Sequence, residues 1–251
     1  MSLSKRTRPP ARPQVSWTCP QIMPPPTQSD LKRQAAQRAL ELVRPGMTVG
    51  LGSGSTATLW IRLLGEQVRD HGLSIRAVAS SEDSERLGRS FGIPIVDLEQ
   101  CKRLDLTVDG ADEIAPGLAL IKGGGGKLLR EKIVATASNR FVIIADASKV
   151  VTQLGRHPLP VEVIPMAEPL VRRSLQDLGF QVDLRRNAAG SPYITDQGNR
   201  LFDCSGVMID DPPRLAAILD GTVGLVEHGL FLNMAQLALI AGPDGLIERE
   251  S

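Results

Sequence analysis

The stretch PGMTVGLGSGSTATLWIRLLGEQV, residues 45–68, indicates how the chain folds. It reads as a short apolar strand, a turn of glycine and serine, and an amphipathic helix that we expect to be capped near Ser55 or Thr56. A helix precedes this stretch, and Asp30 is its expected N-cap. Three more apolar strands follow, within IRAVASS, LDLTVDGADEI and FVIIADASK, with helical segments between them. Apolar strands that alternate with helices predict an α/β fold, in which helices cover both faces of a parallel sheet.

A different pattern begins near residue 159. The segments read in order as strand, helix, strand, strand, helix and strand: LPVEVI, AEPLVRRSLQDLG, FQVDLRR, RLFDCSGVMI, DPPRLAAILDG and TVGLVEHGLF. This is the split βαβ order of a ferredoxin-like unit, β-α-β-β-α-β. We therefore predict a small α+β domain at residues 159–230. It is inserted into a Rossmann-like parallel-sheet domain formed by residues 30–158 and 231–251.

Residues 1–29 differ in composition from the rest of the chain. They hold seven of the 18 prolines and no acidic residue, and four of them are basic: Lys5, Arg6, Arg8 and Arg12. We predict a disordered leader. It lacks the apolar segment of a secretory signal, so we expect a cytoplasmic protein, or one of an organellar stroma if the leader is a transit peptide.

The bulk composition excludes several classes of function. The net charge is +1 over 251 residues and aromatic residues make up 3%, which argues against a nucleic-acid-binding protein. The cysteines and histidines are scattered without metal-ligand spacing: Cys19, Cys101, Cys204, His71, His157 and His228. No apolar run is long enough to span a bilayer. We expect no nucleic-acid partner, no membrane association and no metal or other cofactor.

The turn GLGSGSTA, residues 50–57, is a candidate phosphate site. It lies between a strand and a helix, where glycine exposes backbone N–H groups and the helix N-terminus favours an anion. Ser53, Ser55 and Thr56 add hydroxyl donors. The turn matches neither the Walker loop nor the dinucleotide fingerprint, because no Lys-Ser/Thr pair closes it and Ser55 replaces the third glycine. An ordinary tight turn is the alternative reading.

Three other motifs also follow predicted strands. DGADEI, residues 109–114, places three carboxylates close together, and a lysine ends ADASK, residues 145–149. IKGGGGKLLREKI, residues 121–133, sets four glycines between Lys122 and Lys127 and carries Glu131 in the helix that follows. Taken singly, these motifs read as a solvated turn, a surface charge and a flexible linker. Four strand ends of one sheet share a crevice, however, and together these groups suit a small anionic polyol whose chemistry is proton transfer.

These motifs, together with LPVEVIP and in this order, resemble ribose-5-phosphate isomerase type A. The resemblance runs from about residue 30 to about residue 247. It implies metal-independent aldose–ketose isomerisation of ribose 5-phosphate to ribulose 5-phosphate, through an enediolate, in the non-oxidative pentose phosphate pathway. It also implies a small-molecule substrate as the partner, no cofactor, and a homodimer or homotetramer.

The resemblance also assigns roles to residues of this chain. It implies that Glu131 is the base that shuttles the proton, that Asp109 assists ring opening, and that Lys122 contacts the reacting end. The implied substrate-binding residues are Ser53, Gly54, Ser55, Thr56, Asp109, Gly110, Ala111, Asp112, Lys122, Gly123, Gly124, Gly125 and Lys149. Lys122 and the bare amides of the glycine run are the expected site for the enediolate oxygens.

Three alternatives share parts of this pattern. An amino-sugar phosphate deaminase of the same fold group is expected to place a histidine in the site motifs, and none of the motifs contains one. A CoA transferase would use its glutamate as a nucleophile on a thioester. A sugar-phosphate sensor would bind the same ligand, but it would not need Glu131.

Overall fold

The computed structural model describes residues 26–251, and its first helix begins earlier than expected. Most of the predicted leader therefore lies outside the described residues, whereas residues 28 and 29 already belong to α1 (Gln28–Leu40). The N-cap is Thr27, so the prediction that Asp30 caps this helix is wrong. The Asp30 N–H donates to Thr27 Oγ1 at 3.2 Å, and the Thr27 N–H donates to Asp30 Oδ2 at 2.9 Å. This reciprocal capping box needs the acid at the third helical residue.

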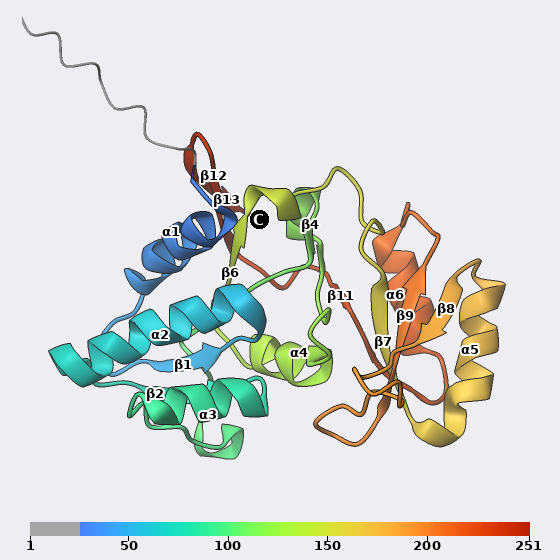
Figure 1. Ribbon diagram of the computed structural model, residues 1–251, viewed down its shortest axis with the longest axis horizontal. Helices are drawn as coiled ribbons and strands as arrows, with labels where there is room; N and C mark the ends of the chain where they lie inside the picture. Colours follow the sequence, from blue (N-terminus) through green and yellow to red (C-terminus); the bar gives the residue numbers. More distant parts are fainter. Residues whose placement is uncertain (1–25) are drawn as a thin grey trace, which may run out of the picture.

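A six-stranded sheet lies at the centre of the larger part of the molecule (Figure 1). Its strands, in spatial order, are β13 (Gly245–Glu250), β12 (Leu237–Gly242), β6 (Phe141–Asp146), β3 (Leu106–Asp109), β1 (Thr48–Leu51) and β2 (Arg76–Ala79). All neighbouring strands are parallel except the β12–β13 hairpin. The last segment of the chain thus returns to this sheet, as its sequence predicts.

Helices and loops cover this sheet on both faces. Alternate residues of β6 point to opposite sides: Val142 and Ile144 join a core with α1 and α2 (Gly54–His71), and Phe141 and Ile143 join another. The helix α3 (Glu82–Ser90) packs on α2, and α4 (Leu128–Thr136) contributes Ala135 to the second core. The predicted α/β class, with a parallel sheet buried on both faces, is confirmed.

A three-stranded antiparallel sheet lies beside the second core. It consists of β11 (Leu230–Phe231), β5 (Leu120–Ile121) and β4 (Glu113–Ile114). The glycine run leaves β5 and enters α4. This run therefore does not follow a strand of the parallel sheet, and only three of the four motifs do. The sequence could not show this, because β4 and β5 have only two residues each.

The four-stranded sheet has the order β10-β7-β9-β8, and all its neighbouring strands are antiparallel. The elements follow the chain as β7 (Leu159–Val163), α5 (Glu168–Asp177), β8 (Gln181–Leu184), β9 (Arg200–Ser205), α6 (Pro212–Asp220) and β10 (Leu225–His228). This is the predicted ferredoxin-like arrangement, with a core of its own around Val161, Leu175 and Phe202. Figure 1 shows it on the far side of α4 from β1. The division into domains at residues 159 and 230 stays a prediction.

The last strand predicted for this unit, in TVGLVEHGLF, divides at Gly229. Before it, β10 pairs with β7; after it, β11 pairs with β5. The Gly229 N–H donates to Pro160 O at 2.8 Å, and its carbonyl accepts from the Lys122 N–H at 2.9 Å. A Cβ at this position would lie 2.4 Å from the Lys122 carbonyl, so only glycine lets these backbones approach.

None of the helices between residues 26 and 251 combines the length and hydropathy that crossing a bilayer requires.

Candidate active site

A pocket opens where the chain leaves β1, β3, β5 and β6. It is lined by Lys32, Ser53, Gly54, Ser55, Thr56, Gly110, Ala111, Asp112, Lys122, Gly123, Gly124, Gly125, Glu131 and Lys149. The structure thus gathers in one wall every residue that the sequence suggests for the site, with Asp109 as the exception. Lys32 is the residue that the sequence reasoning missed.

The turn after β1 presents unpaired backbone donors to the pocket. The helix α2 begins at Gly54, earlier than the predicted cap near Ser55 or Thr56, and its N-cap is Ser53. Within the described residues, no side chain caps its first turn, because the Ser53 hydroxyl pairs with Ser80 Oγ at 2.8 Å instead. The N–H groups of the first turn therefore remain available to an anion, beside the positive end of the helix dipole.

Lys32 lies at the same end of the pocket. Its Nζ donates to Ser55 Oγ at 3.0 Å, so α1 brings a positive charge to the first turn of α2. No local motif marks this lysine, because it lies in α1 and reaches the turn after β1 only in the folded chain. Lys149, after β6, is a second cation of this wall.

Lys122 is buried among carboxylates. Its Nζ lies 2.8 Å from Asp109 Oδ2 and 3.5 Å from Glu131 Oε2, and it donates to Gly110 O at 2.7 Å. Burial by itself would lower the pKa of this lysine. The charges of Asp109 and Glu131 outweigh burial and raise the pKa, so Lys122 is a fixed cation in the wall.

Among the carboxylates of the pocket, Glu131 has the most strongly shifted pKa. It lies on α4, is 5% exposed, and its Oε2 has no hydrogen-bond partner within residues 26–251. Burial raises the pKa of Glu131 to about 7; Lys122 opposes this rise, and Asp109 and Asp112 add to it. The attraction to Lys122 is limited because the ammonium lies closer to Asp109. A carboxylate with a pKa near 7 is suited to take up and return a proton.

Asp109 lies behind the wall and not in it. It is 1% exposed, and its Oδ1 accepts from the N–H groups of Ser53 at 2.8 Å and Gly110 at 2.7 Å. Its Oδ2 faces Lys122. With both oxygens occupied in this way, the carboxylate fixes the turn after β1 and the lysine. Asp109 does not line the pocket, and its expected role at the sugar stays a prediction.

Asp112 is the aspartate that does line the pocket. Its Oδ2 accepts from the Gly124 N–H at 2.7 Å, which ties the acidic turn to the glycine run. Its Oδ1 lies 4.0 Å from Nε2 of His157. No histidine lies in the sequence motifs, yet the fold brings one to the edge of the site, although His157 is not part of the pocket wall.

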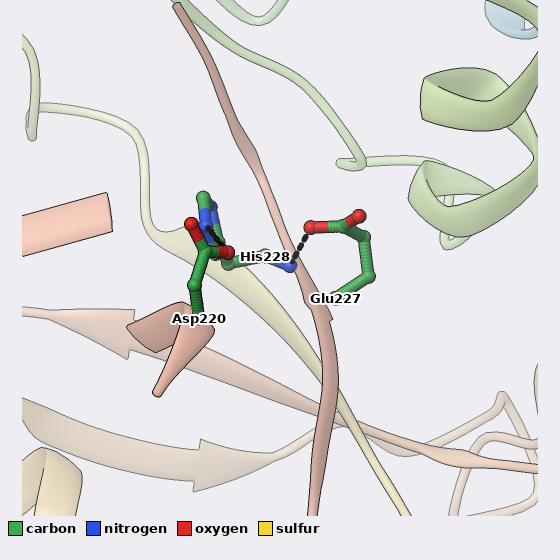
Figure 2. A group of neighbouring side chains, drawn as sticks. All are labelled: Asp220, Glu227 and His228. Carbon is green, nitrogen blue, oxygen red and sulfur yellow. Dashed lines mark hydrogen bonds and ion pairs between the residues drawn. The ribbon is translucent and has the colours of Figure 1, made fainter. Parts of the chain in front are cut away.

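One group of potential metal ligands occurs within the described residues, and it lies away from the pocket: Asp220, Glu227 and His228 (Figure 2). Its ligand atoms already have partners. His228 Nδ1 accepts from the Leu230 N–H at 3.2 Å, and Nε2 then donates to Asp220 Oδ1 at 3.0 Å. Glu227 Oε1 accepts from Lys132 Nζ at 2.6 Å. This lysine holds a positive charge where a cation would bind, so the group suits an ion-pair network better than a metal.

Comparisons with known proteins find similar proteins over most of the chain. A family model described as ribose 5-phosphate isomerase A (phosphoriboisomerase A) matches residues 76–245. Ribose-5-phosphate isomerase A of Roseiflexus castenholzii is 50% identical over 221 residues, which cover 87% of this chain and 94% of the relative. The protein of that name from Nitrobacter hamburgensis is 50% identical over 222 residues, covering 86% and 95%.

Solved structures give the same result. Ribose 5-phosphate isomerase A of Methanocaldococcus jannaschii is 38% identical, with a TM-score of 0.86 over 90% of this chain and all of that chain. A D-ribose-5-phosphate isomerase in complex with phospho-erythronic acid is 35% identical, with a TM-score of 0.87 and the same coverage.

Proposed function

The chain belongs to the ribose 5-phosphate isomerase A family, and we propose that its pocket interconverts D-ribose 5-phosphate and D-ribulose 5-phosphate through an enediolate. The observation that carries this mechanism is the buried Glu131. Burial raises its pKa to about 7, and its Oε2 lies 3.5 Å from the ammonium of Lys122 in a pocket rich in N–H donors. A base next to a fixed cation is what proton transfer beside a carbonyl requires.

The phosphate binds at the α2 end of the pocket. The N–H groups of Ser55 and Thr56 and their hydroxyls face it, and the ammonium groups of Lys32 and Lys149 neutralise its charge. Glu131 and Lys122 belong to the other motifs of the pocket, so the bound phosphate orients the sugar with C1 and C2 toward them. Fixed orientation of this kind lowers the barrier because the reacting atoms are already placed.

Ring opening comes first, because the sugar in solution is mostly cyclic. Asp112 is the aspartate in the pocket wall, and we assign this role to it in place of the buried Asp109. Its carboxylate accepts the proton of the anomeric hydroxyl and returns it to the ring oxygen, whose bond to C1 breaks. The product is the open-chain aldehyde.

The isomerisation then moves one proton. Glu131 removes the C2 proton, the C–H electron pair forms the C1–C2 double bond, and O1 receives the carbonyl electrons. The ammonium of Lys122 and N–H groups of the glycine run stabilise the negative oxygen. Glu131 returns its proton to C1, the proton of the C2 hydroxyl passes to the negative O1, and C2 becomes the ketone. The protons and electrons balance without an external oxidant or reductant.

Several further features follow from the family resemblance. We expect a homodimer or homotetramer, a cytoplasmic location and a role in the non-oxidative pentose phosphate pathway. The assignment of residues 159–230 to an inserted domain belongs to the same group of proposals. Light scattering of the purified protein gives the oligomeric state directly, and a monomer would overturn that part of the proposal.

The decisive experiment is isomerisation by the metal-stripped protein. Ribose 5-phosphate is added after treatment with a chelator, and ketose formation is followed. We expect turnover that survives the chelator in the native protein and is nearly lost in E131Q. Strict dependence on an added metal, or equal turnover in the two proteins, would overturn the mechanism.

A further inference from the structure

The glycine run is held from outside the pocket by an arginine. Arg185 follows β8, and its Nη1 donates to the carbonyl oxygens of Gly123 at 3.3 Å and Gly124 at 3.0 Å. Its Nε donates to Asp203 Oδ2 at 2.9 Å and its Nη2 to Asp203 Oδ1, so the two groups form a bidentate pair. This pair fixes the plane of the guanidinium. The position of Nη1 is therefore set by the four-stranded sheet.

The peptide bond between Gly124 and Gly125 is consequently held in one orientation. All peptide bonds of the described residues are trans, so the Gly125 N–H points away from the carbonyl that Arg185 binds. Gly125 lines the pocket, whereas Arg185 does not. Within residues 26–251, no protein acceptor faces the Gly125 N–H. This donor is left for a ligand.

The neighbouring peptides are already occupied. The Gly124 N–H donates to Asp112, and the Gly126 N–H donates to Gly123 O at 2.8 Å. Glycine gives a peptide bond wide freedom to rotate, so the run itself cannot keep the Gly125 N–H aimed at the pocket. A side chain from elsewhere has to fix it.

We propose that Arg185 is a positioning residue for the isomerisation. It holds the peptide between Gly124 and Gly125 so that the Gly125 N–H donates to the negative oxygen of the enediolate. The inference rests on the proposed function, since the enediolate is the charge that this N–H stabilises. The guanidinium also sits at the carbonyl end of the same peptide, where its charge polarises the N–H toward the oxyanion.

This role explains why the four-stranded sheet lies against the catalytic pocket. Arg185 directly follows β8, Asp203 lies in β9, and the connection between these strands makes a second contact beside the glycine run. Asp196 of this connection pairs with Lys127, the N-cap of α4, next to the last glycine. This unit thus contributes no group to the pocket wall, yet it holds the loop that stabilises the reacting oxygen from both sides.

The test compares R185M with R186M. Arg186 is the exposed neighbour, and its Nη1 binds only the carbonyl of Gly190, at 2.8 Å, so R186M is a matched control. The two probes are 4-phospho-erythronate, whose carboxylate imitates the two oxygens of the enediolate, and inorganic phosphate. The readouts are kcat and KM for ribose 5-phosphate, the inhibition constants of both probes, and thermal unfolding.

We expect kcat of R185M to fall about 10- to 100-fold, less than the loss of an oxyanion donor itself, with a matching rise in the inhibition constant of 4-phospho-erythronate. KM and phosphate inhibition should change by less than about threefold, because the phosphate turn is untouched. R186M should equal the native protein. Native-like kcat in folded R185M overturns the inference. An equal loss of affinity for 4-phospho-erythronate and for phosphate also overturns it, because that result indicates a less ordered pocket as a whole.

A second variant covers the case in which R185M does not fold. D203N removes the ionic partner of Arg185 but leaves its contact with the loop possible, and it should lower kcat in the same way by a smaller factor. Native-like kcat and probe affinities in folded D203N would then overturn the inference. The proposed function is tested separately, because it fails only if the native protein and R186M do not isomerise ribose 5-phosphate.

Discussion

Replacing Glu131 with glutamine tests the proposed base directly. Glutamine keeps nearly the same shape, so E131Q preserves the pocket while it removes the charge and the ability to accept a proton. Acid–base catalysis by a positioned side chain contributes roughly 10²–10⁴-fold, and we expect kcat to fall by about that factor. KM should change little, because the proposed phosphate contacts come from the turn after β1 and from Lys32 and Lys149.

The same variant should be more stable than the native protein at high pH. Burial, with Asp109 and Asp112, raises the pKa of Glu131 from an ordinary 4.5 to about 7 against the attraction of Lys122. The folded protein therefore binds more protons than the unfolded chain between these values, and its stability falls as the pH rises through this window. A shift of this size corresponds to about 3 kcal/mol. E131Q has no titrating group at this position, so it should not lose this stability as the pH rises.

Two measurements settle this prediction. Ketose formation gives kcat, and urea unfolding near pH 5 and near pH 8 gives the stability of both proteins. We expect similar stabilities near pH 5 and a gain of up to about 3 kcal/mol for E131Q near pH 8. Turnover of E131Q within about tenfold of native would refute the role of the base. A stability difference that is the same at both pH values would refute the raised pKa.

Three further predictions follow from the pocket. D112N removes a carboxylate that raises the pKa of Glu131. The midpoint at which kcat/KM falls off on the acid side of the pH profile should therefore move from near pH 7 to a lower pH. An unchanged midpoint would contradict this prediction. K32M removes a proposed charged contact with the phosphate, so KM should rise about 10- to 100-fold with a smaller effect on kcat. R33M, at the exposed neighbouring residue, should leave KM unchanged. In G52A the new Cβ would lie 2.3 Å from the carboxylate of Asp109, so kcat/KM should fall about 10²-fold. Native-like kinetics would show that the turn can shift freely.

The sequence by itself predicts the fold class and nearly all of the pocket. Alternating strands and helices predict the parallel sheet, and the order of elements after residue 159 predicts the ferredoxin-like sheet. These features are local, since period, glycine turns and capping residues act over a few positions. Glu131, Lys122 and the glycine run are also found this way, because they stand together in one motif.

Only the tertiary structure decides which aspartate lines the pocket and which groups act from a distance. Asp109 and Asp112 differ by three positions in one turn, yet one is enclosed by N–H donors and Lys122 and the other lines the pocket. Lys32 and Arg185 reach the site from elements that are distant in sequence. Burial, ion pairing and contacts between remote segments depend on how the layers pack, and no local pattern of residues encodes that packing.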